Sequence, residues 1–436
     1  MYQIIKELAE KYHGETINNR RDFHQYAERG WLELRTASII ARKLEKLGYE
    51  VLAGKEVMKA DARMGLPPQK ILDLTYIRAV KQGADEEYVE KVRDGFTGVV
   101  GILRNGEGPI IAIRFDIDAL GIIEDSNESH LPSKKEFSSC NKEAMHACGH
   151  DGHASIGLTV AKILMDIKKY LRGTVKLIFQ PAEEGVRGAR SIAESGILDD
   201  VDYIYAAHIM PRVEDYDLFF GMNESFATTK LDVIYHGVAT HAAESPQYGK
   251  NAVLSAANCI LNLHAIPRNS DGQTRVNIGC VHAGTGRNVI PETAMLEVEV
   301  RGVTTELNRY MEIHALDIIN ASALMQDTAV EVREMGKAYA LNCDDQFMNK
   351  IRSIIKKNLN DIKIPPTNLS PLGGSDDFSY MMERVQSHGG KATYMKLLTP
   401  IQSSPHNDAF DFDEKVLEKG PRIFASITYY LMKKGA

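Results

Sequence analysis

Four short segments of the sequence carry the residue types that bind metal ions and transfer protons. Three of them come directly after apolar runs that are typical of buried strands: Asp116, the adjacent pair Glu183 and Glu184, and His208. The fourth, residues 146–153, contains three histidines and a cysteine and lies between Asp116 and the two glutamates. In open α/β sheets, ligands bind beyond the carboxyl ends of the strands. The sequence therefore predicts that all four segments meet at one site.

The histidine-rich segment has the ligand chemistry of a site for zinc or a related divalent ion. Its members are His146, Cys148, His150 and His153, and thiolate and imidazole are strong ligands for such ions. Gly149 permits a tight turn, so Cys148 and His150 could approach one site from a loop. An isolated Cys-x-His pair would more often be a polar helix cap. Three histidines and a cysteine within eight residues, near acidic strand ends, favour the metal site.

Glu183 and Glu184 could divide the work of metal binding and proton transfer. Just past a strand end, one carboxylate can bind a metal ion while its neighbour accepts a proton from an activated water. A Glu-Glu pair is more often a solvated surface turn. Here the preceding apolar strand and the intervening Pro181 and Ala182 favour a buried approach.

Two further histidines gain meaning only as members of this set. His208 alone would more often be a hydrogen-bonded core histidine, because it follows two alanines in an apolar run. His406 alone would be an ordinary loop residue. We include both because the predicted site needs ligands that are far apart in the sequence.

The elements that must position these residues alternate between strands and helices. Alternation of this kind indicates an α/β sheet with parallel members. The second predicted strand comes before a helix and the third after it. We expect strands at 98–103, 109–114, 174–179 and 203–208, and helices at 1–12, 33–47, 72–81, 154–167, 346–358 and 415–432.

The pattern changes near Gly221, where a smaller unit interrupts the α/β body. Between 229 and 333 the order is strand, helix, strand, strand, helix, strand, and two of these strands alternate apolar and polar residues. This order predicts a half-exposed antiparallel sheet with two helices on one face. We therefore expect a catalytic domain formed by residues 1–221 and 337–436, interrupted by an inserted unit at 222–336. The polar segment 55–95 has no role that follows from its residues.

Composition excludes several classes of partner. The charged share of 25% and the hydrophobic share of 44% are those of a globular protein, and the net charge of −7 argues against a nucleic-acid partner. The apolar runs are too short to span a membrane, and residues 1–12 lack a signal peptide's apolar stretch. The five cysteines are scattered and predict no disulfide framework. We expect a cytoplasmic enzyme.

Five motifs together resemble a known enzyme family. They lie at 21–24, 114–120, 146–153, 180–184 and 288–291, so the resemblance spans essentially the whole chain. The sequence is similar to the metal-dependent amidohydrolases of the aminoacylase, hippurate-hydrolase and carboxypeptidase G type. This resemblance implies a zinc-peptidase-like catalytic domain with a mixed sheet. It also implies that the inserted unit is a ferredoxin-like α+β domain of four strands and two helices, which acts as a lid and in dimerisation.

The resemblance also implies a two-metal site. Two divalent ions, Mn²⁺ or Zn²⁺, would be held by Cys148, His150, Glu184, His208 and His406. Cys148 would bridge the pair of ions. The ligand set is compatible with both metals.

Roles for the other predicted site residues follow from the same resemblance. Glu183 would be the general base and later the acid, and Asp116 would orient a metal-binding histidine. His241 would polarise the scissile carbonyl, often from the second chain of a dimer. Asn288 and Arg301 would hold the α-carboxylate of the substrate, for which the fork of a guanidinium is suited.

Arg301 has a second interpretation, and the sequence departs from the family pattern in places. Arg301 could instead form a cross-strand ion pair with Glu297 or Glu299. Gly121 replaces a usual proline, and a late Gly-Ser-Glu-Asp element carries Asp376 in place of the glutamate. None of these departures removes a predicted metal ligand.

The resemblance points to a small-molecule amide substrate. We expect hydrolysis of an N-acyl or N-aroyl amino acid, because segments 63–67, 95–98, 227–230 and 410–413 are most similar to the branch that cleaves p-aminobenzoyl-glutamate. A dipeptidase of the same fold, and a non-catalytic subunit of a hetero-oligomeric hydrolase, are the alternatives. The assembly would be a homodimer or a heterodimer with a homologous chain.

Overall fold

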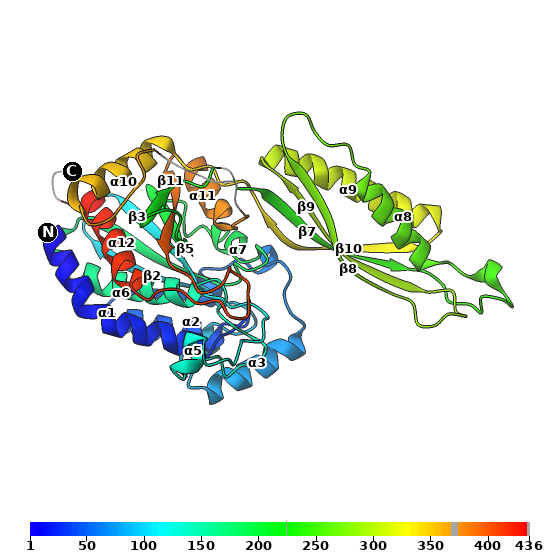
Figure 1. The fold of residues 1–436 in the computed structure, drawn as a ribbon, viewed down its shortest axis with the longest axis horizontal. Helices are drawn as coiled ribbons and strands as arrows, with labels where there is room; N and C mark the ends of the chain where they lie inside the picture. Colours follow the sequence, from blue (N-terminus) through cyan, green and yellow to red (C-terminus); the bar gives the residue numbers. More distant parts are fainter. Residues whose placement is uncertain (224, 368–373, 434–436) are drawn as a thin grey trace.

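Two β-sheets organise the chain, one in a larger body and one in a unit that projects from it (Figure 1). The structure, a computed structural model, describes residues 1–223, 225–367 and 374–433. Both termini of the described chain lie in the larger body, far from the projecting unit. Within the described residues, no helix has the length and apolar character needed to cross a bilayer.

The larger body is built on a mixed seven-stranded sheet with the order β1-β2-β4-β3-β5-β11-β6. Its four central strands, β4, β3, β5 and β11, run parallel, and the remaining three pair antiparallel at the two sides. The central strands are buried on both faces, as parallel strands usually are. The strands are β1 (Glu50–Ala53), β2 (Val99–Asn105), β3 (Ile110–Asp116), β4 (Gly173–Gln180), β5 (Tyr203–Pro211), β6 (Leu218–Phe220) and β11 (Lys391–Thr399).

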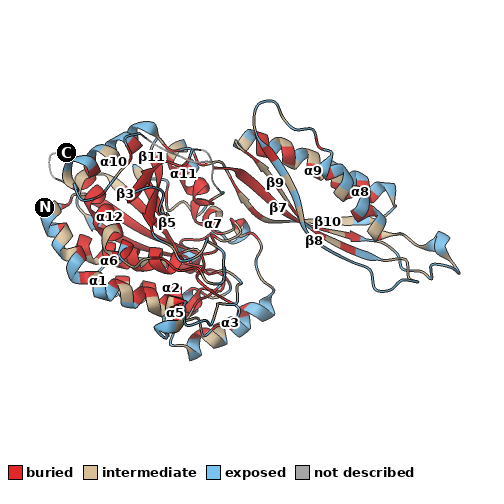
Figure 2. Ribbon diagram, viewed as in Figure 1, coloured by how far each residue is buried: buried red, intermediate tan, exposed pale blue. Residues whose placement is uncertain are grey.

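Alternate residues of these strands feed two separate hydrophobic clusters, one on each face. In β3, Ile111 and Ile113 belong to one cluster and Ala112 to the other, because successive side chains of a strand point to opposite faces. Helices cover both clusters, and their buried sides face the sheet (Figure 2). The first cluster packs against α1 (Tyr2–Gln25), α2 (Leu34–Lys46), α6 (His150–Asp166), α10 (Asp345–Asn358) and α12 (Val416–Met432), and the second against α7 (Ala189–Ala193) and α11 (Phe378–Ser387).

The projecting unit is an antiparallel four-stranded sheet, ordered β10-β7-β9-β8, with two helices on one face. Asn251 and Thr304 cap these helices through their side chains, which accept backbone N–H groups of the first turn. A third hydrophobic cluster lies between helices and sheet. The elements are β7 (Ala227–His236), α8 (Ala252–His264), β8 (Thr274–Ala283), β9 (Thr293–Gly302), α9 (Thr305–Met325) and β10 (Ala329–Ala338). We refer to this unit as the lid.

The predicted fold class is confirmed, and several element predictions need correction. β10 continues to Ala338, two residues beyond the boundary placed at 336. Helix α1 continues to Gln25 rather than ending near 12, because its second half buries polar side chains such as Arg20 and His24 that break the apolar pattern. Three strands, β1, β6 and β11, and helix α11 were not predicted. The polar segment 55–95 contains α3 (Gln69–Lys81) and α4 (Tyr88–Lys91), which pack against α2.

Candidate active site

The turn that follows β4 fixes two neighbouring carboxylates. The backbone N–H groups of Glu183 and Glu184 each donate to a carboxylate oxygen of Asp118 at 3.0 Å. The N–H of Ala182, whose φ is +50°, donates to Glu33 at 2.8 Å. These buried hydrogen bonds hold the chain in a tight turn at the end of the strand, so the two glutamates project in defined directions.

The five predicted metal ligands converge, and Cys148 is common to two groups. The donor atoms of Cys148, His150 and His208 all lie within 4.8 Å of one another, and so do those of Cys148, Glu184 and His406. The Cys148 Sγ is 3.4 Å from His208 Nε2, and His406 Nε2 is 3.4 Å from Glu184 Oε1. This geometry suits two cations that share one thiolate.

The two buried histidines of this cluster are oriented as metal ligands usually are. The Nδ1–H of His150 donates to the backbone oxygen of Asp118 at 2.9 Å, and that of His208 donates to Ile209 O at 2.7 Å. Each ring therefore turns Nε2 toward the cluster, which is the arrangement found in metal sites. The Nε2 of His150 is buried and has no hydrogen-bond partner among the described residues, so the donor set fits a bound cation.

His153 supports the cluster rather than joining it. Its Nδ1 contacts the Asp116 carboxylate, and its Nε2 accepts the Ile209 N–H at 2.8 Å, so the protein uses both ring nitrogens. Its ring lies 4.6 Å, centroid to centroid, from that of His208. Asp116 therefore orients His153 directly and approaches the predicted ligand His150 only to 3.9 Å. The expected contact of Asp116 with a metal-binding histidine is replaced by this indirect one.

Burial and like charge make this cluster poorly suited to stay without a cation. Burial, the Asp376 carboxylate and the Glu184 carboxylate raise the pKa of Glu183 well above its usual range. Burial and the charge of Glu184 also raise the pKa of the Cys148 thiol. Burial and the charge of His153 lower the pKa of His208, which keeps that ring neutral. A bound cation would offset these effects on the acids, because it stabilises thiolate and carboxylate.

A cavity of about 270 Å³ opens beside the cluster, between the larger body and the lid. Glu183, Glu184 and Cys148 line one side of it, and Arg301 of the lid lines another. Arg301 also donates to Glu299 at 2.9 Å, so the cross-strand ion pair that the sequence left open is present while Arg301 still faces the cavity.

His241 and Asn288 lie together, but far from this cavity. Both are exposed at the distal end of the lid, where His241 bridges to Val289 and the Ala242 N–H donates to Asn288 O at 3.0 Å. Arg301 lies near the opposite end of β9, and its eight-residue offset from the start of that strand corresponds to about 27 Å. Within one chain, Asn288 and Arg301 therefore do not meet the same carboxylate.

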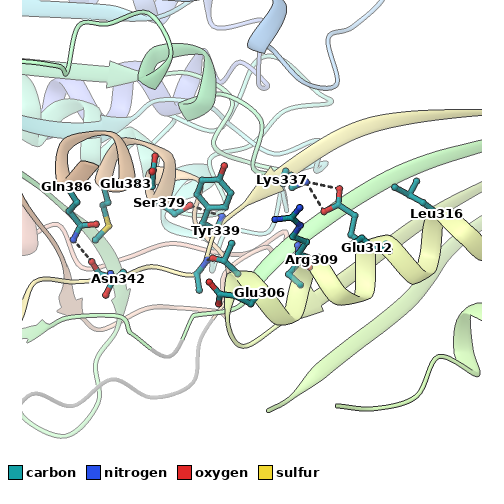
Figure 3. A pocket seen from close by; sticks show the side chains of 15 residues that line it. Glu306, Arg309, Glu312, Leu316, Lys337, Tyr339, Asn342, Ser379, Glu383 and Gln386 are labelled. Carbon is teal, nitrogen blue, oxygen red and sulfur yellow. Dashed lines mark hydrogen bonds and ion pairs between the residues drawn. The ribbon is translucent and has the colours of Figure 1, made fainter. Parts of the chain in front are cut away.

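A larger cavity, about 690 Å³, lies elsewhere at the junction of the body and the lid, between α9, the chain after β10, and α11 (Figure 3). The charged side chains there are occupied by neighbours: Lys337 forms an ion pair with Glu312 at 2.7 Å, and Gln386 donates to Asn342 O at 2.8 Å. None of the residues that line it belongs to a potential metal-binding group among the described residues. Size alone therefore does not identify the catalytic site.

Several residues that shape the site were not predicted from the sequence. Arg114 is buried between Asp116 and Asp376, and Asp118 holds the glutamate turn. Lys396 lines the catalytic cavity from β11. A charged residue inside an apolar strand is a signal for such a role, and Lys396 in the run Tyr394–Leu398 shows it.

A model of the peptidase family M20/M25/M40 matches residues 112–429, which include the whole cluster. The chain belongs to this family. It is accordingly a metallo-amidohydrolase or peptidase, and the family predicted from the sequence motifs is confirmed.

Three relatives of this M20 chain have informative names. The indole-3-acetyl-aspartic acid hydrolase of Enterobacter agglomerans is 43% identical over 415 residues, covering 95% of each chain. One of the chains named for p-aminobenzoyl-glutamate hydrolase in Escherichia coli is 43% identical over 422 residues, covering 95% of this chain and 94% of its own. The structure of an aminobenzoyl-glutamate utilization protein from Klebsiella pneumoniae superimposes with a TM-score of 0.85 at 37% identity and 98% coverage of both chains.

Proposed function

We propose that this M20 enzyme hydrolyses the amide bond of N-acyl or N-aroyl amino acids, with p-aminobenzoyl-glutamate as the first substrate to test. The observation that carries the proposal is the shared position of Cys148 in two ligand groups, with Glu183 beside them. The relatives from Escherichia coli and Enterobacter agglomerans are named for different acyl groups at the same identity, so indole-3-acetyl-aspartate is the second substrate to test. We propose a cytoplasmic location for the enzyme.

In this proposal the residues Cys148, His150, Glu184, His208 and His406 would hold two divalent ions, Mn²⁺ or Zn²⁺. Ions of this kind polarise an amide carbonyl and lower the pKa of water toward ~7. The chain's own residues would keep them in place, because the ring nitrogens that face away from the cluster in His150 and His208 are fixed by backbone oxygens.

Glu183 would move the protons of the reaction. Its carboxylate is buried beside the ligand groups, and its backbone is fixed by Asp118. It would accept a proton as water attacks the carbonyl carbon and then donate that proton to the departing amine nitrogen. Its raised pKa in the cation-free protein suits a group that must hold a proton in one step and release it in another.

The substrate's α-carboxylate would be held by Arg301, and its carbonyl oxygen would receive a hydrogen bond from His241 of a second chain. The N–H groups of Ala243 and Glu244 donate to His241 Nδ1, so the proton of this ring lies on Nε2, which is free to donate. Because His241 is distant from the cavity of its own chain, this role needs a partner. Asn288, beside it, would arrive with it.

A homodimer formed through the lid is the partner arrangement that we propose, with a heterodimer with a homologous chain as the alternative. The lid exposes apolar side chains on its two helices, among them Leu261 at 71% and Leu324 at 83% of their full exposure. Exposed apolar surface of this kind is typical of contacts between chains. The closed symmetry of a dimer would let each lid reach the other chain's cavity.

The decisive test is to incubate the purified, metal-loaded protein with p-aminobenzoyl-glutamate, indole-3-acetyl-aspartate, hippurate and a dipeptide, and to measure release of the amino acid. We expect cleavage of the acylated amino acids and little cleavage of the dipeptide, whose free amino group needs an acidic partner. Rapid dipeptide cleavage would favour the dipeptidase. Absence of all cleavage with both metals bound would favour a non-catalytic subunit.

A further inference from the structure

Lys396 is a buried cation without an acidic partner. Only 4% of its surface is exposed, and no hydrogen bond or ion pair involves its side chain among the residues that the structure describes. Burial lowers the pKa of its ammonium group, since nothing around it offsets the loss of hydration. An unpaired buried charge is costly, so a lysine here is expected only where a ligand supplies the missing anion.

Other buried cations of the same body show what Lys396 lacks. Lys176, on strand β4, is equally buried at 4% exposure and pairs with Asp200 at 2.5 Å. Arg20 pairs with Asp151 at 2.7 Å, and Arg114 with Asp376 at 3.1 Å. The chain thus provides carboxylates for its structural buried cations, and Lys396 is the exception.

The position of Lys396 explains where its anion would come from. In the parallel pair of β11 and β5, Lys396 is opposite His208, so both side chains lie on the same face of the sheet. Both line the 270 Å³ catalytic cavity, together with the apolar Met210 and Met222. The ammonium group therefore belongs to the wall of the cavity, next to the proposed ligand cluster.

We propose that Lys396 is a specificity residue that binds the side-chain carboxylate of the substrate's amino acid, so that the enzyme selects N-acyl conjugates of aspartate and glutamate. The inference rests on the proposed function and deepens it. A conjugate of this class carries two carboxylates, and the cavity offers one cation from each domain. Arg301, from the lid, meets the α-carboxylate, and Lys396, from the body, meets the side chain.

The two cations differ in a way that suits this division. Arg301 already shares the charge of Glu299 and is partly exposed, whereas Lys396 stands alone in a largely apolar wall. A charge in such surroundings discriminates strongly, because a neutral side chain would leave the ammonium group buried and unpaired. The same pocket therefore rejects the isosteric amides of glutamine and asparagine.

The test compares p-aminobenzoyl-L-glutamate with p-aminobenzoyl-L-glutamine, which has nearly the same size and no side-chain charge. For the wild-type enzyme we expect kcat/KM to be at least about 10-fold higher for the glutamate conjugate. Lys396→Met keeps most of the side-chain length and removes the charge. It should lower kcat/KM for the glutamate conjugate about 10- to 100-fold and leave that for the glutamine conjugate within about 3-fold.

Lys391→Met is the matched control, because Lys391 lies on the same strand, is paired with Asp344 at 2.9 Å, and is absent from the cavity lining. It should preserve both rates. Equal loss on both conjugates in Lys396→Met would overturn the inference, since Lys396 would then bind the α-carboxylate or support the fold. No preference in the wild type would also overturn it, while leaving the proposed hydrolase intact. Absence of cleavage of either conjugate by the wild type would instead contradict the proposed function.

Thermal unfolding of the metal-free proteins gives a readout that needs no turnover. Because Lys396 is a buried charge without a partner, Lys396→Met should melt at the same temperature as the wild type or above it. p-Aminobenzoyl-L-glutamate should raise the melting temperature of the wild type more than that of Lys396→Met. A strongly lowered melting temperature in the variant would mean that Lys396 has a structural partner, which contradicts the inference.

Discussion

At the scale of single residues, the turn after β4 gives two adjacent carboxylates different surroundings. Glu184 lies beside His406, whose hydrogen bond and charge hold its pKa below the usual value although burial alone would raise it. Glu183 lies instead beside Asp376 and has a raised pKa. One carboxylate is thus suited to bind a cation and the other to carry a proton.

Replacing Glu183 tests this division. Glu183→Gln should lower kcat by at least about 10²- to 10⁴-fold, because the proton acceptor is lost, while the metal content stays nearly unchanged. Steady-state rates and elemental analysis of the purified protein measure both. Glu184→Gln is the matched neighbour and should lose metal together with activity. Loss of metal in Glu183→Gln would count against its assignment as the base.

Cys148 should behave as a shared ligand. Cys148→Ala removes a donor atom from both groups at once, so bound metal should fall well below two ions per chain and activity should fall with it. Elemental analysis of dialysed protein is the measurement. Cys280→Ala, on strand β8 of the lid, is the control and should retain both ions. Full metal occupancy in Cys148→Ala would remove the thiolate from the site.

At the scale of elements, a buried acid joins the start of α2 to the turn after β4. Glu33 precedes α2, accepts the N–H of Ala182 and receives a hydrogen bond from Thr97 at 2.7 Å. Burial and the charge of Asp118 raise the pKa of Glu33 from 4.5 to about 8. The folded protein therefore holds a proton on Glu33 that the unfolded chain has released.

This difference makes stability depend on pH in a defined direction. Since the folded-state pKa is raised, the contribution of Glu33 is most favourable below pH 4.5 and is lost as the pH rises toward 8. Glu33→Gln keeps both hydrogen bonds without the charge. Its melting temperature, in the metal-free protein, should exceed that of the wild type by about 2 °C or more at pH 8 and by less at pH 5. Glu86→Gln, at an exposed position, should show no such trend. A difference that is constant with pH would contradict the raised pKa.

At the scale of the whole molecule, the lid separates residues that the proposed reaction uses together. Arg301 faces the cavity of its own chain, whereas His241 and Asn288 lie at the far end of the same domain (Figure 1). A second chain is the simplest source of these two side chains. Activity of mixed dimers can test that arrangement.

Glu183→Gln and His241→Ala are each expected to be inactive alone. In a mixed dimer, the chain that keeps Glu183 would receive His241 from its partner, so one site of two is restored. Random exchange of the two variants should return about a quarter of the wild-type activity, because half of the dimers are mixed. The rate before and after exchange is the measurement. Failure to regain activity, with exchange verified by mass spectrometry, would place His241 in its own chain's site or outside the reaction.

The sequence by itself determined the chemistry and the broad order of elements. Residues such as Cys148 and Glu184 were predicted because ligand chemistry and strand ends are local properties. The lid strands were predicted because alternation of apolar and polar residues is also local. β11 was not predicted, since Lys391 and Lys396 interrupt its apolar run and its burial comes from neighbours far away in the chain.

Only the tertiary structure decided which residues meet. Asp116 bonds to His153 because α6 turns that ring toward β3, and Asn288 is separated from Arg301 because an antiparallel hairpin places them at opposite ends of one strand. Lys396 reaches the catalytic cavity because β11 pairs with β5 across nearly two hundred residues of sequence. Local pattern fixes the type and face of an element, but sheet order and register depend on long-range pairing, and these set the distances on which catalysis depends.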